Sequence, residues 1–379
     1  MKTVPLTPEM QTDWEAACQT NEQAWFWHTA TWLSYQLGYK PESRPVDRSF
    51  AVTEGNNILA VCPLIEETSD TEEAAVREFT SGGAPGLAPA VETRGTPAQY
   101  RAIEKLAMQH IDELAAEYGI ARCALRMSPL AGAPLNSSTP SWNRLMAYGY
   151  ADRSLNTQVI AVGQPLESLR RDMSKGHRAD VRRGLDRFSY QVYDSSNVTP
   201  AIFESYQRVH LAAAGRITRP QETFDLMFEW VRDGLGILVA AAEGERHTSF
   251  VYVNIYKHGA YYSSSATLPI FDRGPVGHVL QWTAIKWLHE HGYLLYEIGW
   301  QQFGPQPHDS PSQKQINISR FKRNFGGVTV PLFMGEKFYS TDYYTLVSQR
   351  RIAEYITALE DGRRTSPVEH PAPRQSVLG

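Results

Sequence analysis

Apolar positions along the chain recur at two different spacings, which predict a mixture of helices and strands. Helical spacing is clearest at 97–118, where a long amphipathic helix is expected to end at Gly119. Further helices are expected at 7–20, 24–37, 165–187, 199–213, 220–233, 277–291, 314–325 and 340–360. Short apolar runs predict strands at 49–54, 58–65, 120–127, 157–162, 188–194, 236–242, 248–256, 259–267 and 293–299. The predicted fold class is therefore mixed α/β (α+β).

The order of these elements divides the chain into two halves, each with a hairpin, a helix and a further strand. The hairpin turns are predicted at Gly55-Asn56-Asn57 and at Lys257-His258-Gly259. We expect a first domain at 1–155, a second at 156–345 and a terminal helix at 346–360. The tail, 361–379, carries three prolines and few large apolar residues, so we expect it to be disordered.

Composition and charge narrow the class of protein. The 379 residues are 42% hydrophobic and 21% charged, which argues against wholesale disorder. A net charge of −4 argues against a protein that coats DNA or an anionic membrane. Cys18, Cys62 and Cys123 lack CxxC spacing, which makes a disulfide framework or a cysteine zinc site improbable. Neither a signal peptide nor a run of about 18 apolar residues is visible, so we expect a soluble, cytoplasmic protein without membrane insertion.

The strongest local charge lies at 169–187, where seven Lys and Arg and three Asp give a net charge of +4. On a helix, one face would carry Arg171, Lys175, Arg178 and Arg182, and another would carry apolar residues. Two interpretations remain open. The basic face could hold an anionic ligand, or it could be a solvated surface, which is the commoner fate of a charge run.

Two later segments are further candidates for binding. A Pro/Gly loop at 269–277 enters a predicted helix, and helix N-termini suit anions, although an ordinary connection would look the same. A long polar loop follows the strand that ends at Gly299, which is unusual unless the loop binds something. It leads to Lys322, between Phe321 and Arg323. A lysine there could stabilise an oxyanion or hold a phosphate, or it could be a plain surface lysine.

Common catalytic motifs are missing from the sequence, which has no GxSxG, HExxH, paired zinc or Walker pattern. The serines at 263–265 could be paired with His278 or His289, but nothing in their spacing supports a nucleophile. His177 and His210 stand alone in the sequence, and such histidines more often pack or form hydrogen bonds than bind metals.

Several of these segments together resemble the Fem-type aminoacyltransferases and their FemAB-like and BioF2-like relatives in the GNAT superfamily. The resemblance covers about residues 20–345 and is most specific at Glu297-Ile298-Gly299, Phe321-Lys322 and Phe325-Gly326-Gly327. It implies two tandem GNAT-like domains packed side by side, each a mixed, mostly antiparallel sheet flanked by helices. The long helical arm of some Fem enzymes has no counterpart here. Pro275 interrupts the glycine-rich pyrophosphate loop of acyl-CoA-dependent relatives, because proline lacks a backbone donor.

The resemblance implies an N-acyltransferase that joins an aminoacyl group from aminoacyl-tRNA, or an acyl group from acyl-CoA, to an amine. The acceptor would be an amino sugar, a cell-wall precursor or a secondary metabolite. No tightly bound cofactor and no metal is expected. The alternative is a non-catalytic GNAT-like protein that binds a ligand or tRNA.

Lys322 matches the family's lysine, which is thought to stabilise charge during transfer. The attacking amine must lose a proton, which Glu297 or Asp309 could accept, and Tyr261 or Tyr262 could donate to the oxyanion. We take Lys322, Glu297 and Tyr261 as the candidate catalytic residues. The candidate substrate-binding residues are Lys175, Arg178, Arg182, Arg216, Tyr262, Ser264, Trp300, Gln302, Asp309 and Arg320.

Overall fold

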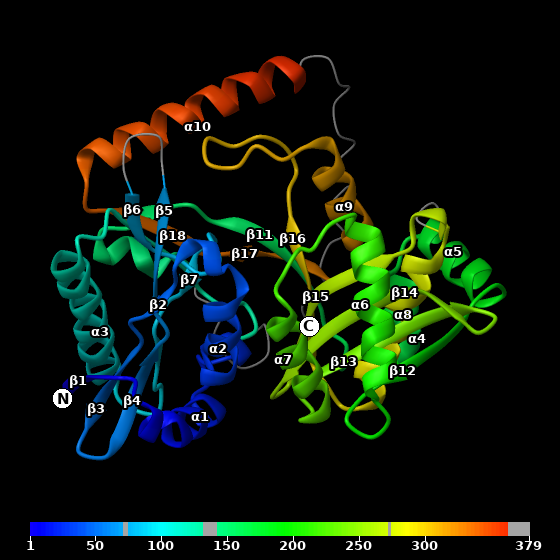
Figure 1. The fold of residues 1–379 in the computed structure, drawn as a ribbon, viewed down its shortest axis with the longest axis horizontal. Coiled ribbons are helices and arrows are strands. Elements are labelled where there is room, and N and C mark those ends of the chain that lie inside the picture. Colours follow the sequence, from blue (N-terminus) through cyan, green and yellow to red (C-terminus); the bar gives the residue numbers. More distant parts are fainter. Residues whose placement is uncertain (71–74, 132–141, 272–273, 363–379) are drawn as a thin grey trace.

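The computed structural model of the protein describes residues 1–70, 75–131, 142–271 and 274–362. These residues form three β-sheets with helices packed around them (Figure 1). The N-terminal half holds two sheets and the C-terminal half holds one. The two halves lie side by side, and α10 (Thr341–Gly362) extends along one edge of the molecule in Figure 1.

The smaller sheet of the N-terminal half is antiparallel, with the strand order β1–β3–β4–β8. The larger has the order β10–β18–β9–β6–β5–β2, with β7 also paired to β9. These strands are β1 (Lys2–Pro5), β2 (Val46–Asp47), β3 (Phe50–Glu54), β4 (Asn57–Cys62), β5 (Ile65–Asp70), β6 (Ala75–Phe79), β7 (Gly86–Leu87), β8 (Ala90–Val91), β9 (Arg122–Arg126), β10 (Ala151–Asp152) and β18 (Met334–Phe338). The helices of this half are α1 (Gln11–Thr20), α2 (Ala30–Tyr39) and α3 (Pro97–Tyr118).

The C-terminal half is built on one sheet with the order β12–β13–β14–β15–β16–β11–β17. Its strands are β11 (Leu155–Ile160), β12 (Ser189–Tyr193), β13 (Gly236–Glu243), β14 (Arg246–Tyr256), β15 (Gly259–Thr267), β16 (Leu295–Gln301) and β17 (Val328–Leu332). Its helices are α4 (Leu166–Asp172), α5 (Lys175–Leu185), α6 (Pro200–Ala214), α7 (Gln221–Arg232), α8 (Val276–Glu290) and α9 (Gln313–Arg323). The largest hydrophobic cluster fills this half and extends to aromatic residues between α1 and α2.

The last strand ties the two halves together. The chain leaves the C-terminal sheet at β17 and inserts β18 between β9 and β10 of the N-terminal half. Glu336 of β18 is 4% exposed and accepts hydrogen bonds from the guanidinium groups of Arg122, Arg153 and Arg351. Burial alone would raise the pKa of Glu336, but the hydrogen bonds and charges of these arginines lower it. A strand that follows the second half is thus fixed in the sheet of the first.

The sequence prediction of a mixed α/β fold is confirmed, and the helix at 97–118 was predicted with its observed bounds. The single helix predicted at 165–187 was wrong. It is two helices, because Ser174 adopts an extended backbone and caps α5 by accepting a hydrogen bond from the His177 N–H. Likewise, 24–37 is not one helix, since α2 begins only after the cap residue Thr29. The domain limits stay a prediction.

Strands β6 and β17 were missed by the sequence analysis. Their side chains are largely exposed until the last one or two residues, so neither strand forms an apolar run. The predicted disordered tail, apart from its first two residues, lies outside the described residues. Among the described residues, none of the helices has both the length and the apolar character needed to cross a membrane.

The arginine cluster around Glu336 leads to a prediction about stability. Glu336→Ala should lower the free energy of unfolding by about 3–5 kcal/mol, because it leaves the partly buried guanidinium groups of Arg153 and Arg351 without their carboxylate. Glu354→Ala is the matched control, since Glu354 pairs with Arg350 on the exposed face of α10, and it should cost about 0.5 kcal/mol or less. Urea unfolding at neutral pH measures both. Equally small losses would show that the cluster does not hold β18 in place.

Candidate functional site

The candidate site lies where β15 and β16 separate. These strands run parallel and pair over three residues only, from Gly259–Leu295 to Tyr261–Glu297. Beyond that point β15 continues with β14, and β16 continues with β11. Each strand carries an irregularity next to the separation, which leaves Ser263 and Ile298 without a register partner. Bulges of this kind re-aim side chains and end pairing, so β15 and β16 diverge here, and this divergence is the opening between the two strands.

Lys322, in the last turn of α9, reaches into this opening. Its Nζ lies 5.6 Å from the centre of the Tyr262 ring on β15. On the β16 side it lies against Gly299, where an added Cβ would stand 2.7 Å from Nζ. Gly299 also has a φ of 104°, which side chains rarely tolerate. A glycine is therefore needed at this position both for the backbone and for the lysine.

The opposite side of the same helical turn anchors α9. Phe321 and Phe325 contact the ring of His177, with ring centres 5.2 and 4.7 Å away. The Phe321 carbonyl also accepts a hydrogen bond from the His177 Nε2–H at 3.0 Å. The start of the helix is held by a capping box in which Ser312 and Gln315 exchange hydrogen bonds. With both ends fixed, Lys322 is held over the separation of the strands.

Glu297 is the acidic group beside Lys322. It is 2% exposed and accepts a 2.8 Å hydrogen bond from the Thr157 hydroxyl of β11. Burial raises the pKa of Glu297 to about 7, although the Thr157 hydrogen bond and the charges of Arg126 and Lys322 oppose the rise. Burial lowers the pKa of Lys322 to about 8, and the charge of Glu297 opposes that fall. Both groups can thus exchange protons near neutral pH.

The tyrosines next to this pair remain protonated at neutral pH. Burial, together with the neighbouring charge of Glu297, raises the pKa of Tyr261 to about 12. The Tyr261 ring packs edge-on against Trp27 of the N-terminal half, with the ring centres 5.0 Å apart. Burial also raises the pKa of Tyr262. Each phenol can therefore act as a hydrogen-bond donor.

Arg126, at the end of β9, is a site residue that the sequence analysis missed. Its charge acts on Glu297 and Tyr261, and its guanidinium lies 6.0 Å from the Trp27 ring centre. The Nε of Arg126 is buried and has no hydrogen-bond partner among the described residues. An arginine at the end of a short strand gives no signal in a sequence, because only the packing of the two halves brings it to Glu297.

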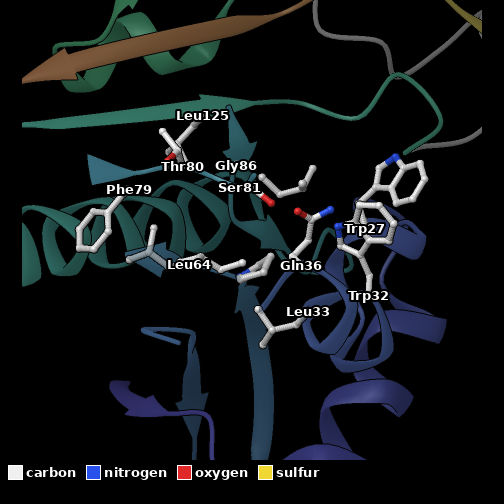
Figure 2. A pocket seen from close by; sticks show the side chains of 13 residues that line it. Trp27, Trp32, Leu33, Gln36, Leu64, Phe79, Thr80, Ser81, Gly86 and Leu125 are labelled. Carbon is white, nitrogen blue, oxygen red and sulfur yellow. The ribbon is translucent and has the colours of Figure 1, made fainter. Parts of the chain in front are cut away.

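Trp27 also lines a pocket in the N-terminal half, together with Trp32, Leu33, Gln36 and Ser81 (Figure 2). The Gln36 amide points into this pocket in Figure 2, and its Oε1 is buried with no partner among the described residues. The open space measures only about 20 Å³, enough for a group the size of a water molecule.

The predicted basic residues do not gather at the opening. Lys175 and Arg178 line an open hollow of about 580 Å³ formed by α4 and α5. Arg178 also donates hydrogen bonds to the Arg171 and Met173 carbonyls at the end of α4, so it has a structural role. Arg182 and Arg216 are exposed, on α5 and in the loop between α6 and α7.

The residue that turns inward from the α6–α7 loop is Arg219, which sequence reasoning missed. Its guanidinium donates to the Tyr35 hydroxyl at 3.0 Å. On the same side of the sheet, Ser264 accepts a 3.1 Å hydrogen bond from the Tyr206 hydroxyl. The Ser264 hydroxyl is therefore already hydrogen-bonded within the protein, to Tyr206.

The remaining predicted residues lie apart from the lysine and glutamate. Trp300 and Asp309 line a cavity of about 230 Å³ in which neither Lys322 nor Glu297 takes part. Gln302 donates to both carboxylate oxygens of Asp309, at 3.0 and 2.9 Å, and this bond folds the polar loop back on itself. Arg320 is exposed on α9. The structure thus brings together Lys322, Glu297, Tyr261 and Tyr262, and not the others.

The contact between Gly299 and Lys322 generates a prediction. Gly299→Ala should lower the free energy of unfolding by about 1–3 kcal/mol, because the new side chain meets a strained backbone and the lysine ammonium. Gly304→Ala is the matched control, since an added Cβ there meets nothing within 4 Å. Urea unfolding of the two variants provides the comparison. Equal stability would mean that Lys322 does not lie across the strand at Gly299.

Comparison with known proteins identifies a family match for part of the chain and solved structures with a similar fold. The acetyltransferase (GNAT) domain family matches residues 167–309. No curated protein sequence gives a significant match. Among solved structures, FemX superposes with a TM-score of 0.65 at 13% identity, covering 92% of this chain and all of FemX.

Two further structures share the fold. The L-PGS of Bacillus licheniformis has a TM-score of 0.56 at 12% identity, covering 92% of this chain and 97% of its own. A tandem GNAT protein from the clavulanic acid biosynthesis pathway has a TM-score of 0.50 at 11% identity, covering 89% and 98%. Residues 167–309 thus match the acetyltransferase (GNAT) domain family, and the chain as a whole shares its fold with FemX and with a tandem GNAT protein.

Proposed function

We propose that the protein is an N-acyltransferase that transfers an aminoacyl group from aminoacyl-tRNA to an amine at the opening between β15 and β16. The observation that carries the proposal is the pair of Lys322 and Glu297, whose pKa values are shifted toward each other where the strands separate. Groups with such pKa values in a partly enclosed site are typical of proton transfer.

The proposed step forms one bond and breaks another. The neutral amine nitrogen of the acceptor attacks the ester carbonyl carbon of the donor, which gives a tetrahedral oxyanion. Collapse of this intermediate forms the amide and breaks the carbon–oxygen bond to the tRNA ribose. The Lys322 ammonium donates a hydrogen bond to the oxyanion, which lowers the free-energy barrier by about 3 kcal/mol. The amine proton passes to the Glu297 carboxylate, and the protonated Glu297 then returns it to the departing ribose oxygen, which leaves as a hydroxyl.

The local pKa shifts suit these roles near neutral pH. With a pKa of about 7, Glu297 is in part ionised and can accept a proton from the amine. With a pKa of about 8, Lys322 is mostly charged and can donate to the oxyanion. Tyr261 is a second donor on the same strand pair, because its phenol keeps its proton.

The start of α8 supports tRNA over acyl-CoA as the donor. Acyl-CoA relatives would hold the pyrophosphate through free backbone N–H groups at this point. Here Pro275 has no N–H, and the Gly274 N–H already donates to the Phe271 carbonyl. The described residues at this turn therefore fit a pyrophosphate poorly. The basic hollow between α4 and α5, lined by Arg170, Arg171 and Lys175, instead suits the phosphates of a tRNA.

A residue of the N-terminal half indicates which kind of acceptor the site could bind. The buried Nε of Arg126 has no hydrogen-bond partner among the described residues and lies near Glu297 and Tyr261, so it supports an acceptor that carries an anionic or carbonyl oxygen close to its amine. An amino sugar, a cell-wall precursor and a secondary metabolite with such a group all remain candidates.

A transfer assay with a matched variant tests this proposal. The purified protein is incubated with charged tRNA or with acyl-CoA and a panel of amines, and amide formation is followed by mass spectrometry. We expect product from charged tRNA. Lys322→Ala should reduce the rate by about 100-fold or more, because an oxyanion donor is lost. Lys314→Ala, at the exposed start of the same helix, should leave the rate unchanged.

Other outcomes would contradict specific parts of the proposal. Full turnover by Lys322→Ala would remove the lysine from the mechanism. Product from acyl-CoA and none from charged tRNA would overturn the choice of donor. Binding of tRNA without any amide product would support the non-catalytic alternative.

A further inference from the structure

A second cluster of reactive side chains lies between α5 and α8. His177 and Asp180 come from α5, and His278 comes from the first turn of α8. Each offers one ligand atom, and the three atoms lie within 4.8 Å of one another. About a hundred residues separate the two helices in sequence, so the histidines stand alone there and the analysis of the sequence expected no metal.

Close packing of the two helices brings these residues together. At Gly184 of α5, an added Cβ would stand 2.2 Å from a methyl group of Val279 and 3.3 Å from the Pro275 carbonyl oxygen. Only a glycine permits α5 to approach the start of α8 this closely. His177 and His278 then meet edge to face, with their ring centres 4.4 Å apart.

The hydrogen bonds of the cluster leave ligand atoms available. The His177 Nε2–H donates to the Phe321 carbonyl, and no hydrogen bond to its Nδ1 is formed within the part of the chain that the structure describes. Metal-bound histidines are commonly oriented by such a bond from their other nitrogen to a backbone carbonyl. Asp180 accepts from Arg183 through Oδ1, while its Oδ2 lies 3.5 Å from Nε2 of His278.

His278 is the member of the cluster whose hydrogen bonding is incomplete. Its Nδ1 is buried and has no partner among the described residues. Burial also lowers the pKa of His177, and it lowers that of His278 to about 4, with the neighbouring imidazole acting in the same direction. Burial thus favours the neutral form of both imidazoles, which is the form that binds metals.

We propose that His177, Asp180 and His278 bind a divalent transition-metal ion of the zinc class. Two imidazoles and one carboxylate form a ligand set that suits Zn²⁺, with the fourth position of a tetrahedral ion left to water. Ligand atoms around such an ion stand roughly 3.3 Å apart, so small side-chain rotations must draw the three groups together.

The bound ion would connect three helices. It would clamp α5 to α8 directly, and through the His177–Phe321 hydrogen bond it would hold the turn of α9 that carries Lys322. The role is structural and requires no acyl donor or acceptor. The metal site can therefore be tested independently of the proposed function.

Metal titration of the full-length protein tests the proposal. Chelator-treated protein is titrated with Zn²⁺ by calorimetry, and thermal unfolding is recorded with and without the ion. We expect one ion per chain and a higher melting temperature with Zn²⁺. His278→Ala and Asp180→Asn should each weaken binding by more than about tenfold, since disturbing even an outer partner of a ligand costs that much. His291→Ala, at the exposed end of the same helix, should bind like the wild type.

Asp180→Asn keeps the size of the side chain, so circular dichroism should show a folded protein and leave the binding result interpretable. Co²⁺ provides a second readout, because the visible absorption of bound Co²⁺ reports its ligands and should disappear in both ligand variants. The proposal is overturned if the wild type binds no Zn²⁺. It is also overturned if Asp180→Asn and His278→Ala bind Zn²⁺ as tightly as His291→Ala does.

Discussion

The parallel strands β15 and β16 are hydrogen-bonded to each other as far as Tyr261 and Glu297. Beyond these residues they separate, and β15 pairs with β14 while β16 pairs with β11. Sheet strands normally stay paired, because backbone groups buried without partners are costly. The separation here is sustained by irregular register on both strands and by α9, which packs against β16. It gives Lys322 a place to lie beside the buried Glu297. Burial at this point of the sheet is the main cause of the shifted pKa values of both groups.

The two halves contribute unequally to this site. The C-terminal half supplies the strands, the lysine and the glutamate, and it contains the region matched by the GNAT domain family. The N-terminal half closes the site with Trp27 and Arg126, which act on Tyr261 and Glu297. The insertion of β18 beside β9, with Glu336 among its arginines, keeps Arg126 at a fixed distance from the C-terminal half. The stability of that insertion is therefore also a condition for the geometry of the site.

The sequence predicted much of this architecture, for reasons that can be traced to particular elements. Amphipathic spacing and the terminal Gly119 located α3, and short apolar runs located the central strands. Lys322 was selected through resemblance to a family, whereas Glu297 and Tyr261 were selected because acyl transfer needs a proton acceptor and an oxyanion donor. The sequence did not reveal residues that come together only through tertiary contacts. Nothing local distinguishes Arg126 from other arginines, or His177 and His278 from packing histidines. Trp300, Gln302 and Asp309 were assigned to the candidate site because they follow Gly299 closely in sequence. The polar loop that carries them folds away from Lys322.

Lys322 and Glu297 form a buried, interacting pair. A titration of the Glu297 carboxyl carbon by NMR measures this interaction directly. The wild-type pKa should be about 7, compared with an ordinary value of 4.5. In Lys322→Met, which keeps the apolar stem and removes the charge, the pKa should rise further, because the lysine's positive charge favours the carboxylate. A Glu297 pKa near 4.5 that Lys322→Met does not change would contradict the account.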